Sequence, residues 1–294
     1  MKLYDFDGMF DEKLGEYIKK HSGEYKESEW EDIIPALYSK FGDTPIKSLG
    51  KTPRAFYAEM SGSELIKCLK AHLRQEVPVS EFLCEAIENK ADIDELIPLL
   101  DGTQGEREYA ANLIGADERV IKKYLELLVQ SDDEDFKDRL ADLIKEKADL
   151  VRKDAAQYYR SGTDREYMLE IMSRSAVRED EIFDILIKEF RTEVDNLPMR
   201  ASYLAAYGDE RALKYLYDKI EDEGLSFIEF QELKYAIEAL GGEYNGERDF
   251  TNDPYYDIIK AHSASAADLF GGAGVSGGRV ADDGTDEGAG DLKN

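Results

Sequence analysis

The stretch LAAYGDERALKYL, residues Leu204–Leu216, decides the fold, because one apolar run ends and a second begins across its Gly-Asp step. The second run has apolar residues at positions i, i+3, i+4 and i+7, namely Leu213, Leu216, Tyr217 and Ile220. This spacing places all four on one face of an α-helix. The stretch therefore predicts two amphipathic helices joined by a turn.

Sequences similar to this Gly-Asp turn occur at two other places in the chain. NLIGADERVIKKYL, residues Asn112–Leu125, carries the Asp-Glu-Arg triplet 92 positions earlier, and YYRSGTDREYMLEIM, residues Tyr158–Met172, is a looser copy between the two. Asp164 of the looser copy lies 47 residues after Asp117 and 45 before Asp209. A period near 46 residues with two helices per unit predicts an array of helical hairpins. Such hairpins must stack, because one alone cannot bury its apolar face.

Helix signals also occur outside these copies, and strand-like alternation is essentially absent, so we predict an all-α fold. Five segments fit the capping pattern Ser/Thr-x-x-Glu that begins many helices: Ser28–Glu31, Ser61–Glu64, Ser131–Glu134, Thr163–Glu166 and Ser226–Glu229. In the amino-terminal third, four helices are expected at about Met9–His21, Ser28–Phe41, Ser63–Arg74 and Ser80–Asn89. The Gly- and Pro-bearing residues 42–56 form a long connection.

The segment RASYLAAYGDERALKYLYDKIED, Arg200–Asp222, resembles a HEAT repeat, with a helix, a Gly-Asp turn and Ala-Leu-x-x-Leu on the second helix. The resemblance implies an α-α superhelix of stacked HEAT-like hairpins, a fold that usually serves as a protein-binding scaffold. We expect such repeats over residues 101–262. Residues 1–100 would be a helical amino-terminal region, either degenerate repeats or a cap, and residues 263–294 a disordered Gly/Ala/Asp-rich tail.

Charge restricts the function. The 294 residues include 65 Asp and Glu against 38 Lys and Arg, a formal net charge of −27. Such a surface repels the phosphates of nucleic acids and anionic lipids, and no window approaches the length of a membrane span. The beginning of the chain lacks the pattern of a secretory signal. We therefore expect a cytoplasmic protein that binds neither nucleic acid nor membrane.

Several short motifs suggest a binding site but are better explained by structure. Gly50-Lys51-Thr52 ends like a phosphate-binding loop, yet Pro45 occupies the place of the loop's first glycine. The calcium-loop-like segments Asp5–Gly8 and Asp282–Gly288 lack ligands at the required positions. The acidic cluster Ser131–Asp135 is explained by helix capping.

The histidines and cysteines likewise favour structural roles. His21, His72 and His262 have no paired ligand spacing, and a His at a helix end such as His21 more often meets exposed carbonyls than a metal ion. Cys68 and Cys84 lie among apolar residues and read as buried thiols. We predict no catalytic, cofactor-binding or metal-binding residues and no cofactor.

Two patterns suggest surfaces. Asp117, Asp164 and Asp209 can cap the helices that follow them, and the neighbouring Arg119 and Arg211 can pair with acids of an adjacent unit. Adjacent tyrosines such as Tyr158-Tyr159 and Tyr255-Tyr256 cannot both face one core, so one of each pair should be partly exposed, as at many interfaces.

The expected function is non-catalytic binding of a protein partner, a basic segment, on the concave face formed by second helices such as Asp209–Asp222. Two alternatives use the same frame. One is an enzyme or cofactor chaperone like the bilin lyases, which needs an enclosed polar pocket. The other is a DNA-binding HEAT-like protein, which needs a face lined with Lys and Arg.

Overall fold

The computed structural model describes residues 2–192, 195–251 and 253–258. These residues form α-helices and short 3-10 helices, and the only β contact among them is one isolated antiparallel bridge between Ile46 and Lys51. The predicted all-α fold is therefore confirmed for the described part of the chain. The expected tail, residues 263–294, and His262 lie outside it.

The chain divides into two compact units, Met1–Leu186 and Ile187–Asn294. Helix α12 (Asp180–Thr192) contains the point of division. The first unit contains α1 (Phe6–Lys20), α2 (Trp30–Gly42), α3 (Pro53–Ala58), α4 (Gly62–Arg74), α5 (Glu81–Lys90), α6 (Ile93–Leu96) with the 3-10 turn η2 (Ile97–Asp101), α7 (Gln104–Ile114), α8 (Ile121–Gln130), α9 (Glu134–Lys145), α10 (Arg152–Ser161) and α11 (Arg165–Ser173). The four helices expected before residue 100 are α1, α2, α4 and α5, and α3 lies at the end of the expected connection.

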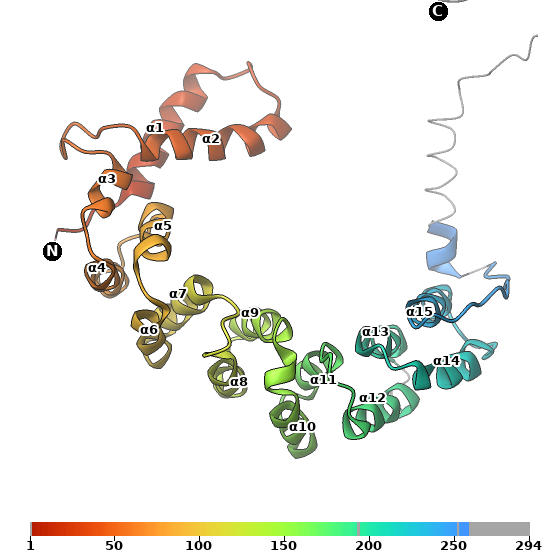
Figure 1. Cartoon of the computed structure of the whole chain (residues 1–294). Helices are drawn as coiled ribbons and strands as arrows, with labels where there is room; N and C mark the ends of the chain where they lie inside the picture. The colour runs from red at the N-terminus through yellow and green to blue at the C-terminus, as the bar shows by residue number, and fades with distance from the viewer. Residues whose placement is uncertain (1, 193–194, 252, 259–294) are drawn as a thin grey trace, which may run out of the picture. The chain divides into compact units, whose positions relative to one another are not determined.

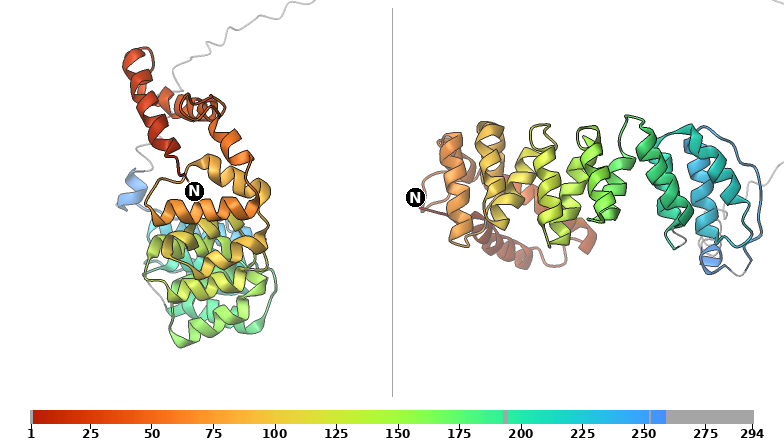
Figure 2. Two further views of the ribbon diagram at one scale, coloured as in Figure 1. Left: turned by 90° about the vertical axis from the view of Figure 1, so that its left-hand side faces the viewer. Right: turned by 90° about the horizontal axis from the view of Figure 1, so that it is seen from below.

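From α4 onward the first unit is a stack of antiparallel hairpins, α4/α5, α6/α7, α8/α9 and α10/α11 (Figures 1 and 2). The first helices, α4, α6, α8 and α10, lie along one side and are called here the first-helix row. The second helices, α5, α7, α9 and α11, lie along the other side and form the second-helix row (Figure 1). Each hairpin buries apolar residues against its partner helix and its neighbours. In α8, for example, five of the ten residues are buried.

The spacing of the hairpins corrects the predicted period. Successive first helices, α4, α6, α8, α10, α12 and then α14 (Leu213–Ile220), begin 28 to 33 residues apart. Three helices, not two, therefore separate one Gly-Asp turn from the next. The turns follow α7, α10 and α13 (Leu197–Tyr207), and each begins at a glycine of positive φ, where a side chain would be strained: Gly115, Gly162 and Gly208.

Contacts between neighbouring hairpins follow the shorter period. Lys137 of α9 pairs with Asp164, 27 positions later, and the two atoms Nζ and Oδ1 are 2.9 Å apart. Lys145 reaches Glu170 at 2.6 Å over a separation of 25 residues. Arg152 reaches Glu179 at 2.7 Å over 27 residues. Each pair thus joins two adjacent hairpins through residues slightly less than one hairpin length apart in sequence.

Helix capping was predicted with mixed success. The boxes Ser61–Glu64 and Ser226–Glu229 are present. At α9 the cap is Asp133, whose carboxylate accepts from Phe136 N at 3.1 Å, and not Ser131. Thr163 is not the cap of α11, which is Asp164, and Ser28 lies in a short 3-10 turn ahead of α2. Two further boxes, at Asp92 and Thr103, were not predicted.

The second unit contains α13, a 3-10 turn (η4, Glu210–Ala212), α14 and α15 (Phe227–Ala239), and α15 packs against both α13 and α14. The consecutive helices α14 and α15 pack together as a hairpin, whereas the HEAT-like segment Arg200–Asp222 comprises α13 from Arg200 onward, the turn η4 and α14. Phe250 continues the core beyond α15, with its ring centroid 5.2 Å from that of Phe230.

Candidate functional site

The two rows of the first unit differ in charge. The helices of the second-helix row carry eleven acidic and six basic residues, a formal charge of −5. The helices of the first-helix row carry five acidic and eight basic residues, a formal charge of +3. Among the helices of the array, the excess negative charge is therefore carried by the second-helix row.

A cavity of about 290 Å³ lies in the second-helix row between α7 and α9. Three of its six lining residues are the carboxylates Glu108, Asp133 and Asp135, and the others are Asn112, Phe136 and Arg139. Arg139 Nε donates to Asn112 Oδ1 at 2.8 Å, so the guanidinium is held against an amide. The cavity is open to solvent and its lining is predominantly negative.

Local structure determines how each carboxylate is used. Asp133 caps α9 and is committed to the helix. Glu108 accepts from Gln104 Nε2 at 2.8 Å on its own helix. Asp135 is exposed in the first turn of α9, where the helix dipole favours a negative charge. No group of three His, Cys, Asp or Glu side chains in the described residues is arranged to hold a metal ion. Two of the three carboxylates, Glu108 and Asp135, are not used as helix caps.

The turn aspartates occupy two kinds of setting. Asp117 and Asp209 each accept from the backbone N–H two residues later, at 3.0 Å, and pair with the side chain of that residue, Arg119 or Arg211. Asp164 instead has φ +43° and binds Lys137 of the preceding hairpin. The predicted pairing with an adjacent unit is confirmed for Arg119, whose Nη1 lies 2.8 Å from Asp94 Oδ1.

The pKa of Asp117 is lowered to about 2, mainly because the Arg119 side chain and backbone N–H bind the carboxylate. These bonds favour the charged form. The aspartates are thus bonded within the fold, but the predicted capping is found only at Asp209, which caps the turn η4. The N-cap residues of α8 and α11, Val120 and Asp164, make no side-chain cap bond.

The cysteines and histidines are placed among packing residues. Burial raises the pKa of both the Cys68 and the Cys84 thiol to about 11, which disfavours the reactive thiolate. His72 is fully buried and its Nδ1 lies 2.8 Å from Pro78 O. His21 does not meet a helix carbonyl through its ring; its Nδ1 pairs with Glu24 at 2.6 Å.

The remaining motifs also have structural roles. Lys51 pairs with Glu59, and Thr52 caps α3 by accepting from Ala55 N at 3.0 Å. Asp5 caps α1 by accepting from Gly8 N at 2.8 Å, whereas Asp282–Gly288 lies outside the described residues. The tyrosine prediction is confirmed: Tyr159 is buried while Tyr158 is half-buried, and Tyr255 is 58% exposed while Tyr256 packs on Phe227.

Comparison with known proteins identifies no relative: no protein-family model, no curated protein and no solved structure matches the chain. Within the described part of the chain, no helix combines the length and apolar character required to cross a bilayer. The functional interpretation therefore rests on the surfaces of the hairpin array.

Proposed function

We propose that this protein is a non-catalytic helical-repeat scaffold that binds a basic segment of a partner protein along the second-helix row. The observation that carries the proposal is the segregation of charge, −5 on the second helices against +3 on the first. Complementary charge across an interface steers association and sets register. Regularly spaced helices also present a continuous surface to an extended partner.

The array is HEAT-like in plan, with amphipathic helix pairs and glycine-bearing turns. Its units of 28 to 33 residues are shorter than the roughly 40–47 residues of HEAT repeats. The hairpin register also changes which helices form the proposed binding surface. By hairpin register α14 is a first helix, equivalent to α8, so the face is assigned to α5, α7, α9 and α11 and not to Asp209–Asp222.

The cavity between α7 and α9 supplies the most specific contact in the proposal. Glu108 and Asp135 line it and, unlike Asp133, neither caps a helix. We assign to them the binding of a Lys or Arg side chain of the partner, with charge-assisted hydrogen bonds as the attraction.

A labelled twelve-residue peptide rich in Lys and Arg, titrated by fluorescence anisotropy, tests this function. The variant Glu108→Gln/Asp135→Asn should weaken binding at least fivefold, and raising the salt from 50 to 500 mM should weaken binding to the unsubstituted protein, since salt screens charge (Debye length roughly 14 Å falling to about 4 Å).

The matched control is Glu126→Gln/Asp154→Asn, which removes the same charge from a cavity between α8 and α10 in the first-helix row. We expect this control to bind within twofold of the unsubstituted protein. Equal weakening by both variants would show that only net charge matters, and that result would overturn the assignment to the second-helix row.

A further inference from the structure

The α1–α2 hairpin is only partly covered by the rest of the first unit. No side chain from residue 11 to residue 40 is buried, although this segment contains large apolar residues. They are Leu14, Tyr17, Ile18, Tyr25, Trp30, Ile33, Ile34, Leu37 and Tyr38. Ile18 is exposed and the other eight are half-buried. The hairpin reaches the core through the buried Phe6, Phe10 and Phe41, and through Tyr38, whose ring stacks on Phe82 of α5 with the centroids 4.7 Å apart. A contiguous set of incompletely buried apolar residues typically marks an interaction site.

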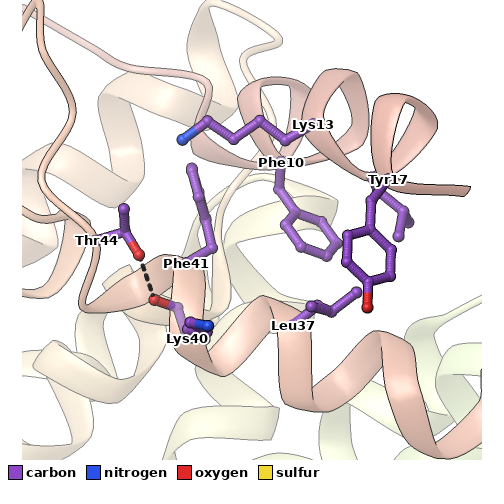
Figure 3. Close-up of a pocket in the computed structure, with 8 residues that line it drawn as sticks. Phe10, Lys13, Tyr17, Leu37, Lys40, Phe41 and Thr44 are labelled. Carbon is purple, nitrogen blue, oxygen red and sulfur yellow. Dashed lines mark hydrogen bonds between the residues drawn. The ribbon is translucent and has the colours of Figure 1, made fainter. Parts of the chain in front are cut away.

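A groove of about 240 Å³ runs between the two helices (Figure 3). Its walls have the same pattern on each helix, an apolar residue, then a lysine three positions on and an apolar residue four positions on: Phe10, Lys13 and Leu14 on α1, and Leu37, Lys40 and Phe41 on α2. Tyr17 continues the α1 series at position i+7, and Thr44, which lies just beyond the end of α2, also lines the groove. The helical period thus directs both sets of side chains toward one groove.

The charges at the groove are all positive. Lys13 and Lys40 are the charged residues among the eight that line it. Lys13 Nζ lies 4.7 Å from the centroid of the Phe41 ring. Asp11, Glu12 and Glu16 fall off the groove face of α1 because they are out of step with the i, i+3, i+4, i+7 series.

We infer that this groove binds an amphipathic helix of a partner protein whose apolar stripe is flanked by carboxylates. The apolar stripe would cover Leu14, Leu37 and Phe41, and the carboxylates would meet Lys13 and Lys40. A third helix laid between two others buries both their faces, which is a common mode of peptide recognition. A second copy of this chain is a poor occupant, since each copy carries a formal charge of −27.

This surface differs in place and in charge preference from the second-helix row. The groove takes an acidic amphipathic helix, whereas the second-helix row takes a basic segment. The inference therefore stands or fails independently of the proposed function.

Trp30 offers a direct readout, because it is the single tryptophan of the chain and its ring centroid lies 6.4 Å from that of the groove residue Tyr17. The probes are two sixteen-residue helical peptides without tryptophan that share one leucine stripe. One peptide has Glu beside the stripe and the other has Lys at the same positions. We expect the Glu peptide to change Trp30 emission and to bind at least tenfold more tightly than the Lys peptide.

Charge reversal provides the decisive variant. Lys13→Glu/Lys40→Glu should lose at least tenfold affinity for the Glu peptide and gain affinity for the Lys peptide. The control Lys19→Glu/Lys47→Glu changes the net charge equally at exposed lysines outside the groove and should stay within threefold. Because all four lysines are exposed, the substitutions are not expected to unfold the chain, which circular dichroism verifies.

Several results would overturn the inference. They are an unchanged preference between the two peptides in the charge-reversed variant, equal losses in variant and control, or occupation of the groove by a second copy. Sedimentation of the unliganded chain as a dimer that Leu37→Asp dissociates would reveal the last. Retention of Glu-peptide binding by Glu108→Gln/Asp135→Asn would separate the groove from the second-helix row.

Discussion

Replacement of Asp164 tests the packing between hairpins most directly. Its carboxylate lies 2.9 Å from Lys137 Nζ, and the side chains of Lys137 and Asp164 are 10% and 19% exposed. The bond raises the pKa of Lys137, with Asp164 the largest contributor. Asp164→Asn removes the charge but keeps an oxygen acceptor, and Asn tolerates the φ of +43° found there. The substitution therefore isolates the ion pair from the turn geometry.

The magnitude follows from what Lys137 retains. Removing one partner of a fully buried ion pair costs roughly 3–5 kcal/mol. Lys137 keeps a second carboxylate, Glu134, at 3.4 Å, and that side chain is 71% exposed. We therefore expect a smaller loss of unfolding free energy, about 1–3 kcal/mol. Lys137→Met/Asp164→Asn should recover much of it, because the uncompensated charge is gone.

Hydrogen exchange at increasing urea concentration measures this loss locally, which matters in a chain of more than one unit. Amides of α9 and α11 should lose protection in Asp164→Asn, while those of α15 should not. Asp117→Asn is the control, since Asp117 pairs with an Arg119 side chain that is 46% exposed and such pairs contribute about 0–1 kcal/mol. The reasoning is refuted if Asp164→Asn is no more destabilising than Asp117→Asn.

Three further predictions concern the fold. Leu140→Ala, at a fully buried site in α9, should cost about 3–5 kcal/mol in urea unfolding, whereas Leu150→Ala, at a residue 42% exposed, should cost less than about 1 kcal/mol. Ser226→Ala should cost about 1 kcal/mol by removing the cap of α15, and Ser28→Ala less than about 0.5 kcal/mol; equal effects would contradict the capping assignment. Because the pKa of Asp117 is lowered to about 2, its stabilising effect should be complete above the unfolded pKa near 3.9 and lost as the pH falls toward 2; a difference in urea midpoint from Asp117→Asn that stays constant from pH 6 to pH 2 would contradict this.

Helix content was predictable from the sequence because apolar periodicity is a local property. The runs around Leu125 and Leu216 have the spacing of a single buried face, and both residues are buried within helices. Cap identity was less predictable. Ser131 and Asp133 are both good hydrogen-bond acceptors and lie two positions apart. Asp133 is the residue that caps α9, whereas Ser131 Oγ accepts from Asp133 N at 3.1 Å. Sequence spacing alone does not decide such a competition.

The candidate surfaces could not be predicted because their residues are brought together by stacking. Glu108 and Asp135 are 27 positions apart, close to one hairpin, but exposed carboxylates are abundant and show no period of their own. The groove between α1 and α2 could not be predicted for a different reason: its residues do show a pattern, but the pattern indicates a buried core face. Phe10, Leu14, Leu37 and Phe41 have the pattern of a core face, and nothing in the pattern indicates that Leu14 and Leu37 remain only half-buried.

The separation of 92 residues between Asp117 and Asp209 follows from the hairpin length. Three hairpins of 28 to 33 residues span that distance, so both aspartates precede a first helix, α8 or α14, and both have the same Asp–Arg arrangement. Asp164 falls one and a half hairpins away and must precede a second helix, α11, which explains its different conformation and its bond to Lys137. The Gly-Asp motif therefore indicates a tight turn after a helix. Such a turn occurs after first helices as well as after second helices. The length of the repeat is therefore given by the spacing of the hairpins and not by the spacing of the Gly-Asp motifs.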